Sequence, residues 1–413
     1  MDVTSLIWTI LWSVIEPLLS LWWLWLLIVL IPLIRSTYDF IQSEQSKAQV
    51  SYTLLELRMP REVTQSPKAM QQVLSVMSTL SGSWHSLEIA AFEGQSHYYI
   101  RTDVKLKPII EASIFSYYPT LEVAEVEDYV LRLPADITEA QERGWDIWGQ
   151  ELILKKPGIF PIKSYVHFEG SENKDFDPMS IFLEMMAKLK PDEFLGIQFI
   201  ISPKDAKWAD IFKEELDKLK ENKKNPDGTP IERTPGQAEI IKAAERNAAL
   251  PAFETYLRVL YAAPKTSFAD SFASKAIMGA FNQFGSFDLN FFVSSKRLET
   301  KVRGKWYLPG PLSMIEKRVL HRKAHLLSRY RRREVPPKSY VGLWLTSTPF
   351  YRNLGGESSV LTIESLATLF HPPTARVVTA PHIKRVDSKK GGPPAGLAIF
   401  GEEADIQKYL QQQ

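Results

Sequence analysis

The 413-residue chain contains no cysteine, and its 50 Lys/Arg and 48 Asp/Glu leave a formal charge of +2. The lack of cysteine excludes a disulfide framework and thiolate chemistry, and it fits a reducing compartment. The balanced charge conceals an asymmetry, because residues 296–334 hold 13 Lys/Arg and 3 Glu and so carry +10, against −8 for the rest.

The chain begins with an apolar run at residues 3–34, interrupted only at Glu16-Pro17. Its second part, residues 18–34, has 17 residues without a charge, which at ~1.5 Å per residue nearly crosses a ~30 Å hydrocarbon core. A cleaved signal peptide is the competing interpretation, but the run lacks a basic n-region and a small-residue cleavage site. Residues 1–45 are therefore predicted to be a membrane anchor.

Two arrangements of this anchor remain open. Its first half can lie in the interface while the second half spans, or one kinked helix can use both. Arg35 and Lys47 follow the run, so the positive-inside rule places the body in the cytoplasm. The predicted localisation is the cell membrane, with a single pass.

Residues 46–136 are predicted to form a first soluble domain. Its expected elements are a strand at 49–59, a helix capped by Ser66, a hairpin of 86–92 with 97–101, a helix at 108–118 and a strand at 120–133. This β-α-β-β-α-β order is the ferredoxin-like (split βαβ) plan, in which an antiparallel sheet buries one face under two helices. The plan supports many functions and argues for none.

Residues 140–305 are predicted to repeat the plan around an insertion at 207–247. The expected elements are a strand or bent hairpin at 151–168, a helix after Asp177-Pro178, and strands at 194–201, 252–261 and 287–293, with a helix at 268–284 before the last strand. The predicted fold class is thus α+β: an N-terminal transmembrane helix, then tandem ferredoxin-like domains. Residues 306–413 would supply a basic amphipathic helix and a C-terminal tail.

No common catalytic motif is present. The sequence lacks G-x-x-x-x-G-K-[ST], G-x-G-x-x-G, G-x-S-x-G and H-E-x-x-H. His321 and His325 lie four residues apart among basic neighbours, so they are predicted to be solvated rather than metal ligands. The acidic cluster Glu125, Glu127 and Asp128 is predicted to mark an exposed strand face. We therefore predict no catalytic residue, no metal, no cofactor and no enzyme activity.

The basic stretch contains the one candidate site. Between residues 312 and 330 apolar side chains recur at helical spacing, and cations occupy the other positions. The candidate contact residues are Lys317, Arg318, Arg322, Lys323, Arg329, Arg331, Arg332 and Arg333. Such a helix can attract anionic lipid or neutralise DNA phosphates. It can equally be a solvated helix that docks its apolar stripe on the body.

A resemblance enters at residues 361–373, LTIESLATLFHPP, where Thr362 is expected to cap a helix and Glu364 to favour its first turn. The phrase resembles the element that precedes the motor domain of membrane-associated type IV secretion and conjugation ATPases. The following VVTAPHIKRVDSKKGGPP resembles their pre-motor linker, and residues 54–80 resemble the start of their N-terminal region. No phosphate-binding loop follows here, so no nucleotide-binding residue is carried over.

The resemblance implies a non-enzymatic, membrane-anchored accessory subunit of a type IV secretion- or conjugation-like machine. A separate P-loop ATPase would be its partner and would meet residues 361–413, DNA or anionic lipid would meet the basic helix, and homo-oligomerisation would follow the hexameric motors of the family. The alternatives are a general membrane-tethered scaffold or interaction protein unrelated to DNA transfer, and a hydrolase or transferase whose site the sequence does not connect.

Overall fold

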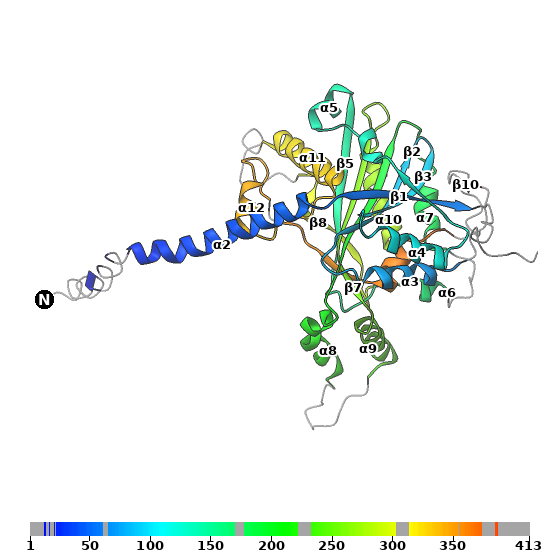
Figure 1. The fold of residues 1–413 in the computed structure, drawn as a ribbon, viewed down its shortest axis with the longest axis horizontal. Helices are drawn as coiled ribbons and strands as arrows, with labels where there is room; N and C mark the ends of the chain where they lie inside the picture. Colours follow the sequence, from blue (N-terminus) through cyan, green and yellow to red (C-terminus); the bar gives the residue numbers. More distant parts are fainter. Residues whose placement is uncertain are drawn as a thin grey trace, which may run out of the picture.

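The computed structural model describes residues 12–13, 16, 20, 22–60, 65–169, 177–221, 233–302, 314–353, 355–373 and 385–386. It is a mixed α+β fold around one ten-stranded sheet of order β10-β1-β3-β2-β6-β7-β5-β8, with β4 also paired to β1 and β9 to β7 (Figure 1). The strands are β1 Tyr52–Pro60, β2 His85–Phe92, β3 Gln95–Asp103, β4 Glu122–Val126, β5 Trp145–Leu154, β6 Phe194–Pro203, β7 Ala252–Pro264, β8 Phe292–Glu299, β9 Ser359–Thr362 and β10 Arg385–Val386. The pairing is antiparallel except between β1 and β10.

The α-helices are α2 Trp22–Ala48, α3 Pro67–Met77, α4 Lys107–Tyr117, α5 Ile137–Glu142, α6 Tyr165–Glu169, α7 Ser180–Met186, α8 Lys213–Lys220, α9 Pro235–Ala248, α10 Asp270–Asn282, α11 Ile315–Arg332, α12 Tyr340–Leu345 and α13 Ile363–Leu369. Two 3-10 turns, η1 Tyr129–Arg132 and η2 Trp208–Phe212, complete the described helical elements.

The first half of the body runs β1-α3-β2-β3-α4-β4 with strand order β4-β1-β3-β2, so the predicted element order is present. Ser66 caps α3 by accepting a hydrogen bond from the Lys68 amide at 3.3 Å, as expected. Glu93 and Gly94 both have positive φ, 53° and 72°, which fits the tight turn of the β2–β3 hairpin. The strand predicted at 120–133 is wrong in length. Strand β4 stops at Val126, because Asp128 accepts from the Val130 amide and starts η1.

The second half contains β5, α7, β6, β7, α10 and β8 in chain order, with strand order β8-β5-β7-β6. The strand predicted at 287–293 is displaced to β8, because Asn290 holds the preceding loop. The Asn290 side chain accepts from the Lys156 amide at 2.9 Å and donates to the Phe160 carbonyl at 3.0 Å. The predicted insertion is present as η2, α8 and α9, which project from the body (Figure 1) and are joined by a Lys220–Glu245 ion pair of 2.8 Å.

The two halves share a strand-to-strand seam. Strand β2 pairs with β6 from His85↔Ile201 to Ala91↔Leu195, so the outer edges of the two four-stranded units merge into one sheet.

Both faces of this sheet are buried, which corrects the expectation of one buried face. One face packs on α3, α4, α7, α10 and α13. The other packs on α5, η1 and α11, whose Leu326, Leu327 and Tyr330 are 1%, 0% and 0% exposed. The basic helix is therefore a layer of the fold, and the interpretation in which it docks its apolar stripe on the body is confirmed.

Helix α2 projects away from the body toward the N-terminus (Figure 1). Among the helices in the described part of the chain, none is long and apolar enough to span a membrane. Three predicted segments lie outside the described residues: the start of the apolar run at 3–11, the linker at 387–396 and the tail at 402–413.

Candidate functional site

Two glycines allow α11 to approach the sheet closely. Gly149 on β5 and Gly196 on β6 lie directly beneath it. A β-carbon at Gly196 would overlap the Tyr330 hydroxyl, and one at Gly149 would overlap the Leu326 side chain. The absence of a side chain at these positions brings the polar end of α11 against polar groups on the central strands.

The eight predicted contact residues do not form one surface. Lys317, Arg318 and Arg332 are exposed or half-exposed, whereas Arg329 and Arg333 are 0% and 5% exposed. Arg329 and Arg333 are thus removed from any lipid or nucleic-acid surface, and for these two the prediction is wrong.

The other three predicted residues bond within the protein. Arg331 donates to the carbonyls of Val130 and Pro134 at 3.0 and 2.8 Å. Arg322 donates to the Glu299 carbonyl at 2.9 Å, and Lys323 pairs with Asp146. The apolar residues at helical spacing predicted the helix correctly. The pattern did not predict that these three cations bond to groups on other elements.

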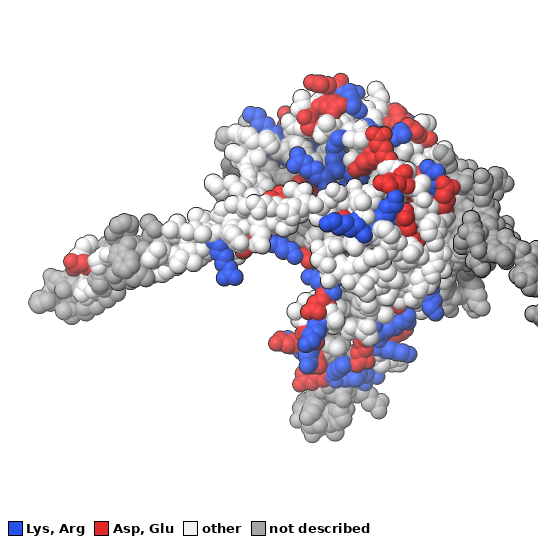
Figure 2. Space-filling model, viewed as in Figure 1, with Lys and Arg blue, Asp and Glu red and all other residues white. Residues whose placement is uncertain are grey.

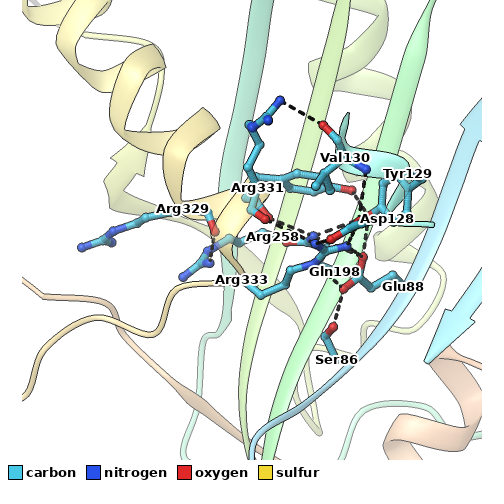
Figure 3. A network of polar contacts seen from close by, with 11 residues as sticks. Ser86, Glu88, Asp128, Tyr129, Val130, Gln198, Arg258, Arg329, Arg331 and Arg333 are labelled. Atoms are coloured by element: carbon cyan, nitrogen blue, oxygen red, sulfur yellow. Dashed lines mark hydrogen bonds and ion pairs between the residues drawn. The ribbon is translucent and has the colours of Figure 1, made fainter. Parts of the chain in front are cut away.

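Arg333 is the centre of a buried ionic network (Figure 3). Its guanidinium meets both carboxylate oxygens of Glu88, at 2.9 Å from Nε and 3.0 Å from Nη2, and Nη2 also meets Asp128 at 2.8 Å. Burial alone would raise the pKa of Glu88, but the charge and hydrogen bonds of Arg333 outweigh it and hold that pKa below its usual value. Glu88 is fully buried and remains ionised.

Neutral groups complete this network. The hydroxyls of Tyr129 and Tyr330 lie 2.9 Å apart, and Tyr129 also donates to Glu88. Gln198 on β6 donates to the Tyr330 carbonyl at 3.1 Å and to Glu88 at 3.3 Å. The network therefore joins β2, β6, η1 and the end of α11 across the seam between the halves.

A second buried pair lies beside it on the second half. Arg258 Nε and Glu151 Oε1 are 2.6 Å apart, with side chains 0% and 1% exposed. Arg258 Nη1 also donates to the Arg329 carbonyl at 3.1 Å, so this pair holds the same helix end. Both sets of charges serve packing, because each carboxylate in them pairs with a guanidinium, although Glu151 Oε2 is buried without a hydrogen-bond partner among the described residues.

The two histidines predicted to be solvated are half-exposed, and each contacts an aromatic ring. His325 packs edge-on against Tyr351 at 4.2 Å between ring centroids, and His321 stacks on Phe350 at 5.1 Å. Burial and, to a smaller extent, the nearby charge of Arg329 lower the pKa of His325 to about 4. Among the described residues no group of three His, Cys, Asp or Glu could hold a metal ion.

The predicted acidic cluster is also divided. Glu125 pairs with Lys107 at 2.6 Å and accepts from Thr53 at 2.7 Å, while Asp128 belongs to the Arg333 network. These carboxylates bind neighbouring side chains instead of facing one another.

A hollow of about 390 Å³ opens beside the network, where α2 ends. Its lining is Glu44, Lys47, Val50, Tyr52, Trp84, His85, Ser86, Arg101, Ile200, Arg332, Arg333, Glu334 and Val335, and we call it the basic hollow. The Arg101 guanidinium lies over the Tyr52 ring, 3.7 Å from its centroid. Sequence reasoning missed Lys47, Tyr52 and Arg101, because three separate elements bring them together and no local pattern joins them.

The segment that carries the family resemblance is part of the core. Helix α13 packs on α3, and β9 pairs with β7. Thr362 precedes α13 as expected, but its hydroxyl bonds Asn247 at 2.8 Å instead of capping the helix. Glu364 in the first turn pairs with Arg246 at 2.7 Å.

These features define an α+β protein with a single ten-stranded sheet, a helix layer on each face and a polar network in its centre. Residues 38–306, which extend from the middle of α2 to just beyond β8, match the family described as domain of unknown function (DUF8128), and the chain belongs to this family. No curated protein matches the chain.

Proposed function

We propose that the protein is a non-enzymatic, membrane-anchored accessory subunit of a type IV secretion- or conjugation-like transfer machine that works with a separate P-loop ATPase. In this proposal the two halves of the sheet are tandem ferredoxin-like units, and they serve as an interaction platform. The body faces the cytoplasm.

The observation that carries the membrane part is the joint between α2 and α12. The Ser36 hydroxyl accepts from the Val341 amide at 3.1 Å, and a β-carbon at Gly342 would lie 2.6 Å from the Phe40 ring. This close packing fixes α2 to the body, while Ile31 and Ile34 farther along α2 are 62% and 58% exposed. Figure 2 shows the uncovered part of α2 as largely free of charged side chains.

Helix α12 adds exposed apolar residues beside the same joint. Its side chains Tyr340, Trp344 and Leu345 are 85%, 76% and 55% exposed. Two basic residues lie near the joint in sequence: Arg35 precedes Ser36, and Lys338 precedes α12. Aromatic and basic side chains of this kind suit the headgroup layer of a bilayer. The joint therefore supports a body held close to a membrane surface.

The machine part of the proposal is supported by the resemblance at residues 361–373. This segment is buried throughout, and β10 farther along the chain pairs with β1, so the region that carries the resemblance is fixed to the body at two places. A fixed position of this region would suit a segment that meets the ATPase at a defined place.

The test uses the absence of cysteine to place single crosslinkers on the full-length protein in native membranes. One variant is Ser388→Cys, in the segment expected to meet the motor, and the matched control is Lys218→Cys on α8. We expect alkali-resistant membrane association of both variants and crosslinking of a P-loop ATPase from position 388 only, identified by mass spectrometry. Membrane association without an ATPase would favour the general scaffold, and extraction of the protein by alkali would overturn the anchor.

A further inference from the structure

We infer that the basic hollow is a binding site for a nucleotide unit, with Arg101 and Arg332 on its phosphate and Trp84 against its base. The inference rests on the lining of the hollow and does not depend on the proposed partners. Only the preference for a nucleotide over a lipid headgroup rests on the proposed membrane position of α2.

The unpaired guanidinium of Arg101 is the first observation that supports an anion in the hollow. This guanidinium makes no ion pair with any described residue, although the residue is half-buried. Burial lowers the pKa of Arg101, and the nearby charge of Arg333 lowers it further. The charges of Glu88 and Asp128 partly oppose this shift, but neither carboxylate pairs with Arg101, so an anion entering the hollow would be stabilised by its guanidinium.

The acids near Arg101 are already occupied. Glu88 and Asp128 both bind Arg333, so the charge of Arg333 is neutralised inside the network. Lys47 at the rim is paired with Glu44 at 2.7 Å. Of the lining charges this leaves the cations of Arg101 and Arg332 and the carboxylate of Glu334. The Arg333 network holds two carboxylates for one cation, so the surroundings are neutral in sum and a phosphate would be held by the two guanidinium groups themselves.

The shape and lining favour a nucleotide over a bare anion. A volume of about 390 Å³ lies in the range of small-ligand sites, ~300–1,000 Å³, and exceeds what a lone phosphate needs. Trp84 lines the hollow and is only half-buried, leaning on Tyr256 at 6.0 Å between centroids. Arginines with an aromatic platform are the usual means of holding a phosphate and a stacked base together.

The phosphate could belong to a free nucleotide or to single-stranded nucleic acid, and the two share this chemistry. A lipid headgroup is disfavoured by distance, because Lys47 lies 13 residues beyond Ile34 along α2, or ~20 Å at ~1.5 Å per residue. Arg332 lines the hollow and is exposed, so a strand bound there can continue along the surface beyond it.

The test measures binding to the full-length protein in nanodiscs made of neutral lipid. Fluorescein-labelled (dT)15 reports strand binding by anisotropy, with AMP, ATP and inorganic phosphate as competitors. We expect Arg101→Gln and Arg332→Gln each to weaken binding by about tenfold and to reduce the salt slope by about one phosphate contact. The matched control is Arg352→Gln, an exposed arginine after α12, which should change nothing.

Trp84→Leu separates stacking from charge. It should weaken binding of (dT)15 at least fivefold and leave competition by inorganic phosphate unchanged. Arg332 is exposed, so its variant keeps the test valid even if Arg101→Gln fails to fold. If AMP displaces (dT)15 as effectively as unlabelled (dT)15 does at the same phosphate concentration, the ligand is a free nucleotide. If AMP does not displace (dT)15, the ligand is a single strand. Unchanged binding in both arginine variants, or no binding of any probe, would overturn the inference.

Discussion

Charged residues in the centre of this sheet occur in ion pairs. Glu88, Glu151 and Arg258 are on interior strands and are each 1% exposed or less. Removing water from an ion costs several kcal/mol, which is offset only when its hydrogen bonds are remade inside the protein. Arg333 makes four hydrogen bonds to two carboxylates, so the ends of α11 and β2 are fixed relative to each other.

Two histidines with lowered pKa, the buried His85 and the half-buried His325, give the protein a defined sensitivity to acid. Burial lowers the pKa of His85 to about 4, partly opposed by Asp103, and the pKa of His325 is lowered to about 4 in the same way. The unfolded chain, with histidine pKa near ~6.5, binds these protons first. The free energy of unfolding should therefore fall as pH drops from about 6.5 to about 4, by on the order of 2–3 kcal/mol per histidine.

The measurement is urea unfolding of the wild type, His85→Gln and His325→Gln between pH 7.5 and 5. Each variant should lose less stability over this interval than the wild type does. Glu56 does not interfere, because its hydrogen bond with His97 lowers its pKa to about 2 and its contribution is lost only below pH ~4.5. Equal pH slopes in all three proteins would show that the two rings are solvated.

At the scale of elements, the position of α11 depends on two missing side chains. Gly196→Ala should push Tyr330 from its place and disturb its bond to Tyr129, because the added β-carbon would overlap the Tyr330 hydroxyl. We expect a loss of about 2–3 kcal/mol in the free energy of unfolding. Thermal and urea denaturation would measure it.

The matched control is Gly279→Ala in α10. Nothing lies within 4 Å of a β-carbon at that position, so the helix should gain up to about 1 kcal/mol. If both variants were equally stable, the approach of α11 to β6 would not depend on Gly196.

The sequence predicted elements where one local signal sufficed. Ser66-Pro67 marked the start of α3, and the β2–β3 hairpin followed from alternation on both sides of Glu93-Gly94. The sequence pattern predicted a β4 that was too long. The strand ends before Asp128, whose side chain caps the turn η1, and this capping role is recognised only in the structure. Strand β9, with four residues, is too short to show a period, and β7 supplies its partner from over 100 residues away.

The candidate site was predicted less well than the fold. Cations on α11 were expected outside because arginine is usually exposed, and the stripe of Leu326, Leu327 and Tyr330 did identify its inner side. What the pattern could not show is that β2 carries Glu88, which binds Arg333. Nor could it show that Glu151 pairs with Arg258, whose guanidinium donates to the Arg329 carbonyl. A charged residue within an otherwise apolar strand was the available signal. It is ambiguous, because the same pattern marks a solvated strand face.

At the scale of the whole molecule, the segments beyond β8 connect the two halves. Helix α11 places Tyr330 and Arg333 against groups from both halves, and α13 lies on α3 while β9 extends β7. The family match ends at residue 306, so α11, α12 and α13 lie beyond the matched region. The described body is thus one structural unit, although its strand order repeats.

The seam between β2 and β6 should make unfolding a single event. Seven residue pairs cross it, and the Arg333 network and the α13–α3 contact span the same boundary, so neither half keeps its buried surface alone. We expect one urea transition with equal midpoints for probes in β3 and in β7, read by hydrogen exchange. A fragment of residues 46–136 should be insoluble or unfolded, because it would expose the apolar edge of β2. Separate transitions for the two probes, or a stable fragment, would show instead that the halves are independent domains in contact.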